Sequence, residues 1–399
     1  MNVLQLCKKY PYPIKDGESL AIVHLSRALQ QQQCSVVLLA MNTRRHWYAG
    51  AATPEALAHY TSVHAVEVDN RIHLWAALCN LPSGRSYHVE RFISEAFASQ
   101  LAVLLQQQTF DIVLLETIYL TLYVPIIRTY SRARIVLRPH NVEAEIWERM
   151  ANHSGLLKRL YLRLQARRLK RYEQAHLNDA DLLAGISERD VALFHALGLH
   201  KPAVVVPIGV NTATYQPDEA CFSQPLSLCF IGSLDWLPNV EGLQWFLREV
   251  WTPWLAPAFP DVTFHIAGRN TPAWLHALHL PRVHVHGEVP DASAFINAHP
   301  VLVVPLLSGG GMRAKIVEAM ALGRVVISTS VGLEGIEANH RSEVWVADDV
   351  PAFVEAVRFC QAHRAELLAM GRRARAFCEA HFDHLRLAER LLAACRALP

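Results

Sequence analysis

Short apolar runs of strand length alternate with longer amphipathic stretches along the whole chain, and this alternation constrains the fold more than any other feature. Continuous apolar strands separated by helices are typical of parallel sheets that are covered on both faces. The runs form two series. The first is Val3–Cys7, Ser35–Ala40, Asp111–Leu115, Arg134–Leu137, Asp181–Ala184 and Ala203–Val206. The second is Leu226–Ile231, Val262–Ala267, Arg282–Val285, Val301–Val304, Val325–Ser328 and Glu343–Val346.

The two series predict two Rossmann-like α/β domains in tandem, because 399 residues are too many for one ordinary core. We place the first domain at residues 1–207, the second at 208–380, and a C-terminal helix at 381–399 that can return to the first domain. Such an arrangement is expected to form a ligand-binding cleft at the carboxyl ends of the strands. Helices are expected at Leu20–Gln32, Val89–Gln107, Asn239–Trp254, Ala314–Leu322, Pro351–Met370 and His384–Leu398.

Composition narrows the class of protein. The net charge is only +2, which argues against a general nucleic-acid binder. Residues 1–210 carry 23 Lys and Arg against 17 Asp and Glu, so the positive charge is concentrated in the first half. The eight cysteines are scattered without a Cys-x-x-Cys pair, as in a protein of a reducing compartment. No apolar run reaches the ~18 residues that a spanning helix needs. We therefore expect a cytoplasmic protein.

A glycine-rich stretch, Ser308–Lys315, follows one of the apolar runs and leads into a predicted helix. Its three consecutive glycines let the backbone approach a ligand closely, and the N-terminus of a helix suits a diphosphate. Arg313 and Lys315 lie in the first turn, where an anion would neutralise them, and Glu318 could accept hydrogen bonds from a ribose diol. The alternative is a tight turn followed by a solvated helix face with an i,i+3 ion pair.

These residues belong to a longer pattern that resembles a known family. Lys315–Thr329, followed by Gly332 and Gly335, is similar to the donor-site signature of the GT-B glycosyltransferases of family 4, also called group 1. Other segments resemble the family in the same order along the chain: Tyr10–Pro13 with Asp16 and Gly17, Arg138–Glu143, Ile186–Ser187, Pro207–Asn211, Phe230–Asn239 and Ile266–Arg269. Each motif is weak alone, but together they span nearly the whole chain.

The resemblance implies a GT-B fold with an acceptor-binding first domain and a nucleotide-sugar-binding second domain. It implies transfer of a sugar, with retention of anomeric configuration and without a metal, from a nucleoside-diphosphate sugar to a hydroxyl of a glycan, glycolipid or lipid-linked acceptor. No cofactor is expected besides that co-substrate.

Roles are expected for particular residues, from the resemblance and, for Arg313 and Lys315, from their position at the start of the predicted helix. The expected catalytic residues are His140, Arg313 and Lys315. The expected donor-binding residues are Gly17, Gly232, Ser233, Gly268, Arg269, Gly309, Gly310, Gly311, Met312 and Glu318. The expected acceptor-side residues are Asp16, Glu18 and Asn141, and no residue is assigned to a metal.

The chain departs from the family pattern at three places. Gly310 stands where the family often has a glutamate, which leaves the donor sugar undefined. The loop after Gly232 lacks the basic residues that usually hold the diphosphate, so we expect Arg313 and Lys315 to supply that charge. Glu18 replaces the second glycine of the N-terminal loop, and its side chain is expected to leave less room for the acceptor.

Other features leave alternatives open. His140 could be a capping or packing histidine, although Asn141 and Glu143 beside it favour a substrate role. The pair Asp179 and Asp181 has metal-binding spacing but precedes its strand. Likewise, His284 and His286 share a strand face without further ligands in view.

Leu156–Glu173 is a basic helix with interleaved leucines. It is either solvated surface whose apolar stripe packs on the first domain, or a contact with an anionic membrane, which would place the protein at the inner face of the cytoplasmic membrane. Two rival functions also remain: a nucleotide-sugar epimerase of the same fold, and a non-catalytic sugar-nucleotide-binding partner in polysaccharide assembly.

Overall fold

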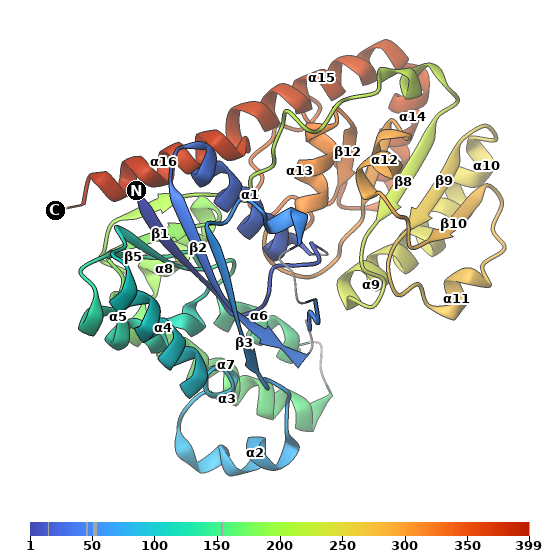
Figure 1. Cartoon of the computed structure of the whole chain (residues 1–399). Helices are drawn as coiled ribbons and strands as arrows, with labels where there is room; N and C mark the ends of the chain where they lie inside the picture. Colours follow the sequence, from blue (N-terminus) through green and yellow to red (C-terminus); the bar gives the residue numbers. More distant parts are fainter. Residues whose placement is uncertain (15, 45–46, 51–53, 153–154, 399) are drawn as a thin grey trace. The chain divides into compact units, whose positions relative to one another are not determined.

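The computed structural model describes residues 1–399 except 15, 45–46, 51–53, 153–154 and 399, and it divides the chain into two compact units. The first unit comprises Met1–Gly209 and His384–Pro399, and the second comprises Val210–Asp383. Each unit is a parallel sheet flanked by helices (Figure 1). The two-domain α/β fold predicted from the apolar runs is therefore confirmed.

The first sheet has the strand order β3-β2-β1-β4-β5-β6-β7 within the described residues, and its neighbours pair in parallel. β1 lies between β2 and β4 and is buried from Val3 to Cys7, a segment that is apolar except for Gln5. The strands are β1 (Asn2–Cys7), β2 (Ser35–Thr43), β3 (Ser62–Val68), β4 (Ile112–Leu115), β5 (Arg134–Leu137), β6 (Leu182–Gly185) and β7 (Ala203–Val205).

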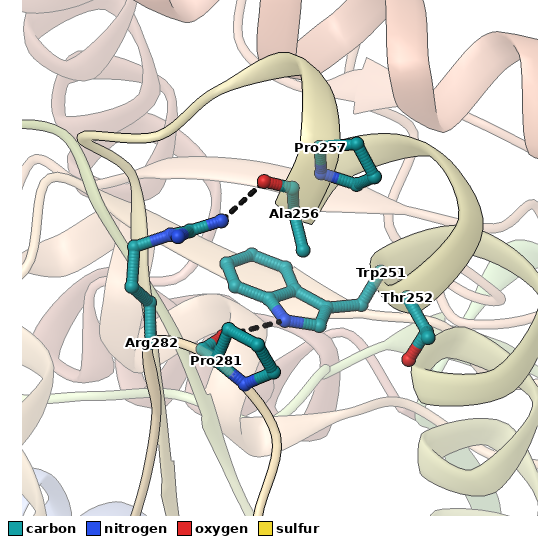
Figure 2. A pocket seen from close by; sticks show the side chains of 6 residues that line it. All are labelled: Trp251, Thr252, Ala256, Pro257, Pro281 and Arg282. Carbon is teal, nitrogen blue, oxygen red and sulfur yellow. Dashed lines mark hydrogen bonds between the residues drawn. The ribbon is translucent and has the colours of Figure 1, made fainter.

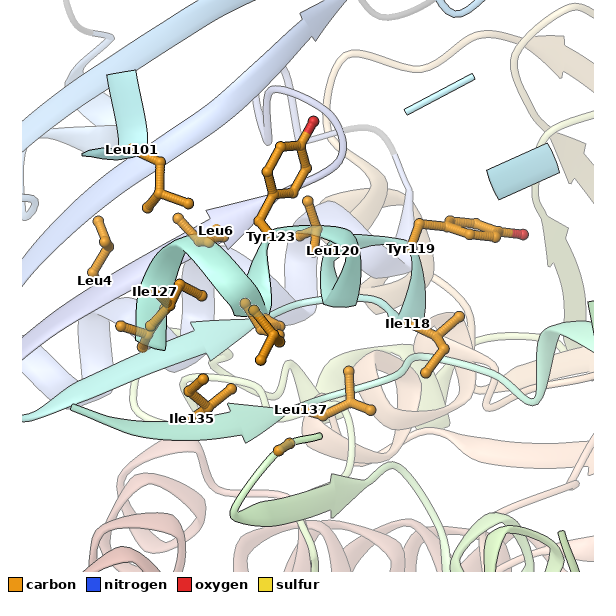
Figure 3. Packing of buried hydrophobic residues seen from close by; sticks show 14 of the residues in the cluster. Leu4, Leu6, Leu101, Ile118, Tyr119, Leu120, Tyr123, Ile127, Ile135 and Leu137 are labelled. Carbon is orange, nitrogen blue, oxygen red and sulfur yellow. The ribbon is translucent and has the colours of Figure 1, made fainter. Parts of the chain in front are cut away.

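The helices of the first unit connect these strands. They are α1 (Gly17–Gln31), η2 (Glu55–Leu57), α2 (Leu74–Cys79), η3 (Leu81–Ser83), α3 (Tyr87–Glu90), α4 (Glu95–Gln107), η4 (Ile118–Tyr123), α5 (Val124–Tyr130), α6 (Glu143–Asn152), α7 (Leu156–His176), α8 (Glu188–Ala196) and α16 (His384–Arg396). Figure 3 shows one face of the sheet, where leucines of β1 pack against Leu101 of α4 and the apolar residues of η4 and α5.

The second sheet has the order β10-β9-β8-β11-β12-β13 within the described residues and is also parallel. Its strands are β8 (Ser227–Ile231), β9 (Thr263–Ala267), β10 (Val283–Gly287), β11 (Val301–Val304), β12 (Val325–Ser328) and β13 (Trp345–Val346). Its helices are η5 (Glu219–Ser223), α9 (Leu237–Trp245), η6 (Phe246–Leu255), α10 (Ala256–Ala258), α11 (Ala273–His276), α12 (Ala292–Asn297), α13 (Ala314–Ala321), α14 (Val350–Ala362) and α15 (Arg364–His381).

Three predicted helices are wrong in detail. The helix expected at Val89–Gln107 is broken, because Ser94 begins α4 by accepting a hydrogen bond from the backbone N–H of Phe97. The helix expected at Pro351–Met370 is two helices, α14 and α15, which meet at His363. The helix expected at Asn239–Trp254 changes from α9 to the π-helix η6, which contains Pro253. Proline has no N–H to continue the α-helical ladder, which fits this change.

The last helix, α16, belongs to the first unit and packs against α1 (Figure 1). Leu387, Leu391 and Leu392 of α16 are buried with residues of α1 and β1 in one apolar cluster. The two units meet after Gly209 and after Asp383, whereas the boundaries expected from the sequence follow residues 207 and 380. None of the helices in the described part of the chain combines the length and apolar character needed to cross a membrane.

Candidate active site

In the second unit, the glycine-rich stretch runs from the carboxyl end of β11 to the start of α13. Gly309 and Gly311 have positive φ angles of 104° and 80°, a backbone conformation that favours glycine. A Cβ atom at Gly309 would lie only 3.2 Å from the Trp236 ring. These glycines therefore let the loop fold tightly against its neighbours, with Gly310 and the half-buried Met312 in the same turn.

Lys315 lies in the first turn of α13, and its side chain is half-buried in the second unit. Its Nζ donates to the carbonyl of Ile231 at 2.8 Å and to Asn239 Oδ1 at 3.0 Å, and it lies 4.5 Å from the centre of the Phe230 ring. Both hydrogen-bond acceptors are neutral. Burial, with Arg313 nearby, lowers the pKa of Lys315 to about 7. An anion placed here would supply the countercharge that these acceptors do not.

The ends of β8 and β9 meet beside this lysine. A Cβ atom at Gly232 would lie 2.7 Å from Asn239 Nδ2 and 2.9 Å from Lys315 Nζ, and one at Gly268 would lie 2.1 Å from the Gly232 carbonyl oxygen. Only glycine fits both positions without a shift of the neighbouring atoms. Ser233 follows Gly232 and donates to Asp235 at 2.6 Å, and the Arg269 carbonyl accepts from the Leu234 N–H at 2.8 Å.

Arg313 is 6% exposed and turned toward the glycine loop that precedes it. Its guanidinium donates to the carbonyls of Gly310 and Gly311 and lies 5.3 Å from the centre of the Trp236 ring. Arg313 therefore holds the loop in shape. Its expected contact with a diphosphate stays a prediction, and it would require some of these donors to face the ligand.

Glu318 lies one turn of α13 beyond Lys315. The hydroxyl of Tyr215 donates to Glu318 Oε1 at 2.9 Å. Burial raises the pKa of Glu318 to about 6, with Asp291 adding to the effect. A carboxylate tuned in this way, with one oxygen held by a tyrosine, has acceptor capacity left for a diol.

In the first unit, the residue after β4 organises the candidate catalytic histidine. Glu116 is fully buried, and its Oε2 accepts from Arg138 Nη1 at 3.0 Å and from His140 Nε2 at 2.9 Å. Its other oxygen accepts from Gln5 Nε2 at 2.5 Å. Burial alone would raise the pKa of Glu116, but Arg138 and His140 outweigh it and lower the pKa. A carboxylate only accepts, so the Nε2–H of His140 is the donor in this bond, and in a neutral imidazole Nδ1 is then an acceptor.

Several charged side chains also lie close together at the N-terminus of α1. Asp16 caps the helix by accepting from the Ser19 N–H at 2.8 Å, and Gly17 is the first residue of the helix. Glu18 lies 3.5 Å from Lys8 Nζ and 3.3 Å from Lys9 Nζ, and Lys9 also binds Asp16 at 2.7 Å. Burial opposes the ionisation of Glu18, but the two lysines lower its pKa.

The segment after His140 leads into α6. Asn141 is partly buried in the bend that precedes the helix. Glu143 begins α6, accepts from the Tyr119 hydroxyl at 3.0 Å and lies 3.6 Å from Lys8 Nζ. The helix start is held by the buried Glu173, which accepts from the backbone N–H groups of Glu143 and Ala144. His140, Glu18 and Glu143 are thus linked to one polar network within the first unit.

Sequence reasoning missed several members of these networks. Glu116, Gln5 and Tyr215 were not assigned a role, and neither were Lys8 and Lys9. The lysines and Glu116 directly follow the apolar strands β1 and β4, so a polar residue at a strand's carboxyl end was an available signal. Gln5 is inside a strand and Tyr215 is 103 residues from Glu318, so neither had one.

The positions considered for metals have other partners. Asp179 is bonded to His176, and Asp181 accepts from Arg128 and from the Ile135 N–H. His286 Nε2 lies 3.0 Å from His265 Nδ1. No group of three or more His, Cys, Asp or Glu side chains in the described part of the chain could hold a metal ion.

Two hollows on the second unit lie apart from the candidate residues. One of about 260 Å³ is lined by Trp251, Thr252, Ala256, Pro257, Pro281 and Arg282 (Figure 2). The other, of about 430 Å³, shares Thr252 and is lined mainly by apolar side chains of η6 and α11 and the segment after α11. Neither lining contains a residue predicted for the site, so both are surface depressions of the scaffold.

Comparison with solved structures identifies the fold. Anabaena HepE in complex with UDP-glucose aligns over 100% of both chains with a TM-score of 0.66 and 14% identity. Sucrose-phosphate synthase from Thermosynechococcus elongatus aligns over 100% of this chain and 99% of its own, with a TM-score of 0.71 and 16% identity. The two parallel sheets and these alignments define the GT-B fold, as the resemblance implied.

Sequence comparison finds a family match in the second unit. Residues 225–362, within the second unit, match the family described as Glycosyl transferases group 1. A Klebsiella pneumoniae relative, described as an uncharacterized 44.6 kDa protein in the cps region, is 25% identical over 231 residues. That alignment covers 55% of this chain and 58% of the relative, so the chain spans little more than half of the relative's length. The chain therefore has a GT-B fold, and part of its second unit is similar to the glycosyl transferases group 1.

Proposed function

We propose that this protein transfers a sugar from a nucleoside-diphosphate sugar to a hydroxyl acceptor. The observation that carries the proposal is the environment of Lys315: a half-buried ammonium group with two neutral acceptors, beside Gly232, at the carboxyl end of a parallel strand. Ligands of open α/β sheets bind at that edge. UDP-glucose bound to the structural neighbour HepE supports a donor of this class.

Within the second unit, each part of the donor has a candidate partner. The diphosphate would lie against the first turn of α13, where Lys315 and the helix N–H groups offer positive charge. Glu318 would accept from the ribose hydroxyls. The donor would lie close to the backbone at the ends of β8 and β9, at Gly232, Ser233, Gly268 and Arg269. The loop from Gly309 to Met312 would lie beside the sugar and phosphates. Arg313 would reach the phosphates from that loop.

The chemistry follows from where charge develops. The bond between the anomeric carbon and the phosphate oxygen breaks, and negative charge gathers on the departing diphosphate. Lys315 and Arg313 stabilise that charge more in the transition state than in the ground state, which is the source of rate enhancement. The acceptor oxygen forms the new bond on the same face, and its proton passes to the departing phosphate. No metal is needed in this scheme.

His140 is proposed to contact the transferred sugar. The carboxylate of Glu116 fixes its Nε2–H, which leaves Nδ1 to accept from a sugar hydroxyl. Gly17 is assigned to the same side of the reaction, and Asp16, Glu18 and Asn141 to the acceptor. Glu18 is held by two lysines, so the acceptor would meet a fixed charge network rather than an open glycine loop.

We propose a glycan, glycolipid or lipid-linked acceptor. The relative in a cps region supports a role in polysaccharide assembly. Such work would place the enzyme in the cytoplasm, at the inner face of the cytoplasmic membrane, with no nucleic-acid partner.

The test is turnover of donor in the presence of acceptor. Arg313→Ala or Lys315→Ala should each lower the rate about 100-fold or more, the usual cost of losing one transition-state donor. Arg358→Ala, an exposed position on α14, is the control and should keep the full rate. Nearly full rates in both active-site variants would contradict the charge assignment. Release of free nucleoside diphosphate only after acceptor is added would separate a transferase from an epimerase and from a non-catalytic binding partner.

A further inference from the structure

The outward face of α7 is unusual because it is apolar at one end and basic along its length. Leu156, Leu160 and Leu164 are 71%, 59% and 37% exposed, and their spacing of four residues puts them in one row. Of the two alternatives for this helix, packing of the apolar stripe on the first unit therefore does not hold for Leu160 and Leu164. The buried side of α7 is formed instead by Leu162, Ala166 and Leu169, together with polar residues such as Gln165 and Glu173.

The charged side chains on this face have one sign. Arg163, Arg167, Lys170 and Arg171 are exposed, and within the described residues they form no ion pair. The helix has one acidic residue, Glu173, and it is buried against the start of α6. The outer surface of α7 thus carries a row of leucines among uncompensated positive charges.

A second exposed apolar segment is anchored to the same helix. The excursion around α2 exposes Ile72 by 60% and Trp75 by 78%. The chain after α2 is fixed to α7, because Arg168 of α7 donates to the carbonyls of Asn80 and Leu81, among others. Figure 1 shows α2 projecting below α3 and α7. The excursion is therefore a fixed projection of the first unit.

We propose that the outward face of α7 and the α2 excursion together form a docking surface for an anionic lipid bilayer. Exposed leucines and a tryptophan among basic residues are suited to insert at the boundary of lipid headgroups and acyl chains, while the basic residues meet anionic headgroups. A symmetric pair of copies is disfavoured at this surface, because a twofold contact would bring the same positive charges together. The inference goes beyond the transfer reaction and does not depend on it.

The test is flotation of the purified full-length protein with vesicles of phosphatidylcholine alone or with about a third phosphatidylglycerol. We expect retention on the anionic vesicles only, and release at high salt. Arg163→Ala with Arg167→Ala should lower the partition constant about 25-fold, taking about fivefold per basic residue. The matched control, Arg132→Ala with Arg358→Ala, removes the same charge at exposed positions elsewhere and should bind nearly as the unchanged protein does.

The apolar contribution has its own pair of variants. Trp75→Ser should lower vesicle binding about tenfold, whereas Trp254→Ser, at a tryptophan 55% exposed in the second unit, should not. Leu160→Ser should behave as Trp75→Ser does. Equal binding to both kinds of vesicle, or unchanged binding of the α7 variants, would overturn the proposal. So would a change in sedimentation on Leu160→Ser without loss of vesicle binding, since this would make the face a contact between copies. No donor or acceptor is present, so failure here leaves the transferase proposal standing.

Discussion

Replacing Lys315 by methionine should make the free protein more stable while removing its affinity for nucleoside diphosphates. Methionine keeps the length and most of the apolar stem of lysine but carries no charge. In the folded chain, the lysine side chain is half-buried, and its ammonium group donates to the Ile231 carbonyl and to Asn239. A site that holds a charge at a cost before its ligand arrives is the signature expected of a preorganised anion site.

The magnitude follows from the pKa. Burial lowers the pKa of Lys315 from 10.5 to about 7, and this difference corresponds to about 4 kcal/mol of unfavourable folding free energy at pH 7. The side chain keeps some solvent contact, which reduces this to about 2 kcal/mol. Losing two hydrogen bonds offsets about 1 kcal/mol of the gain. We therefore expect a net stabilisation of about 1 kcal/mol.

The stability gained by Lys315→Met should depend on pH. Because the folded pKa is lower than the unfolded one, the cost is fully present below pH 7 and is lost as the pH rises toward 10.5. The advantage of Lys315→Met over the unchanged protein should therefore be largest at pH 6 and disappear by about pH 10. Urea unfolding followed by fluorescence at pH 6, 8 and 10 measures it, with Lys201→Met of the first unit as the control. A variant that is less stable at pH 6 would show that the ammonium group is already well paired and would refute the reasoning.

Three further predictions concern the same residues. Gly232→Ala should weaken nucleotide binding at least tenfold in calorimetry, because its Cβ would lie 2.9 Å from Lys315 Nζ, and normal affinity would mean that these groups do not meet the ligand. Glu116→Gln should lower turnover about tenfold, because the side chain at position 116 would no longer hold the Nε2–H of His140, and unchanged turnover would leave Glu116 a purely structural role. Donor affinity should rise with pH through about 6, as Glu318 ionises, and fall above about 7, as Lys315 loses its proton, so a flat titration of affinity would contradict both assignments.

The fold was largely predictable because its strands are buried. β5, β11 and β12 have the bounds expected from their unbroken apolar sequence. β3 (Ser62–Val68) was missed because it is an edge strand whose side chains are mostly half-exposed, so that its sequence has no continuous apolar run. An edge strand with one solvated face gives only a weak alternation.

Helix breaks were harder because tertiary contacts make them. The residues between α3 and α4 contain no glycine or proline, yet the chain turns there. The hydroxyl of Tyr123 accepts from the Ser94 N–H and donates to the Phe92 carbonyl, which fixes the turn from about 30 residues away. No local pattern could have indicated a partner at that distance.

The candidate site divides in the same way. Gly232, Lys315 and Glu318 were named from local motifs, and the structure brings the first two together. Their supporting partners come from distant segments: Tyr215 for Glu318, and Glu116 for His140. A motif reports the residues that touch a ligand, whereas the residues that set their pKa and orientation are joined to them only by folding.

Nucleotide binding by the second unit is the central claim, and thermal stabilisation tests it most directly. The unchanged protein and the Lys315→Met variant would each be heated without ligand and with a UDP-, a GDP- or an ADP-sugar. Ligand at about 100 times its Kd adds about 3 kcal/mol to the apparent stability. We predict a clear rise in melting temperature with at least one of these donors, and little or none in the variant. No rise with any donor, or an equal rise in the variant, would contradict the proposed donor site.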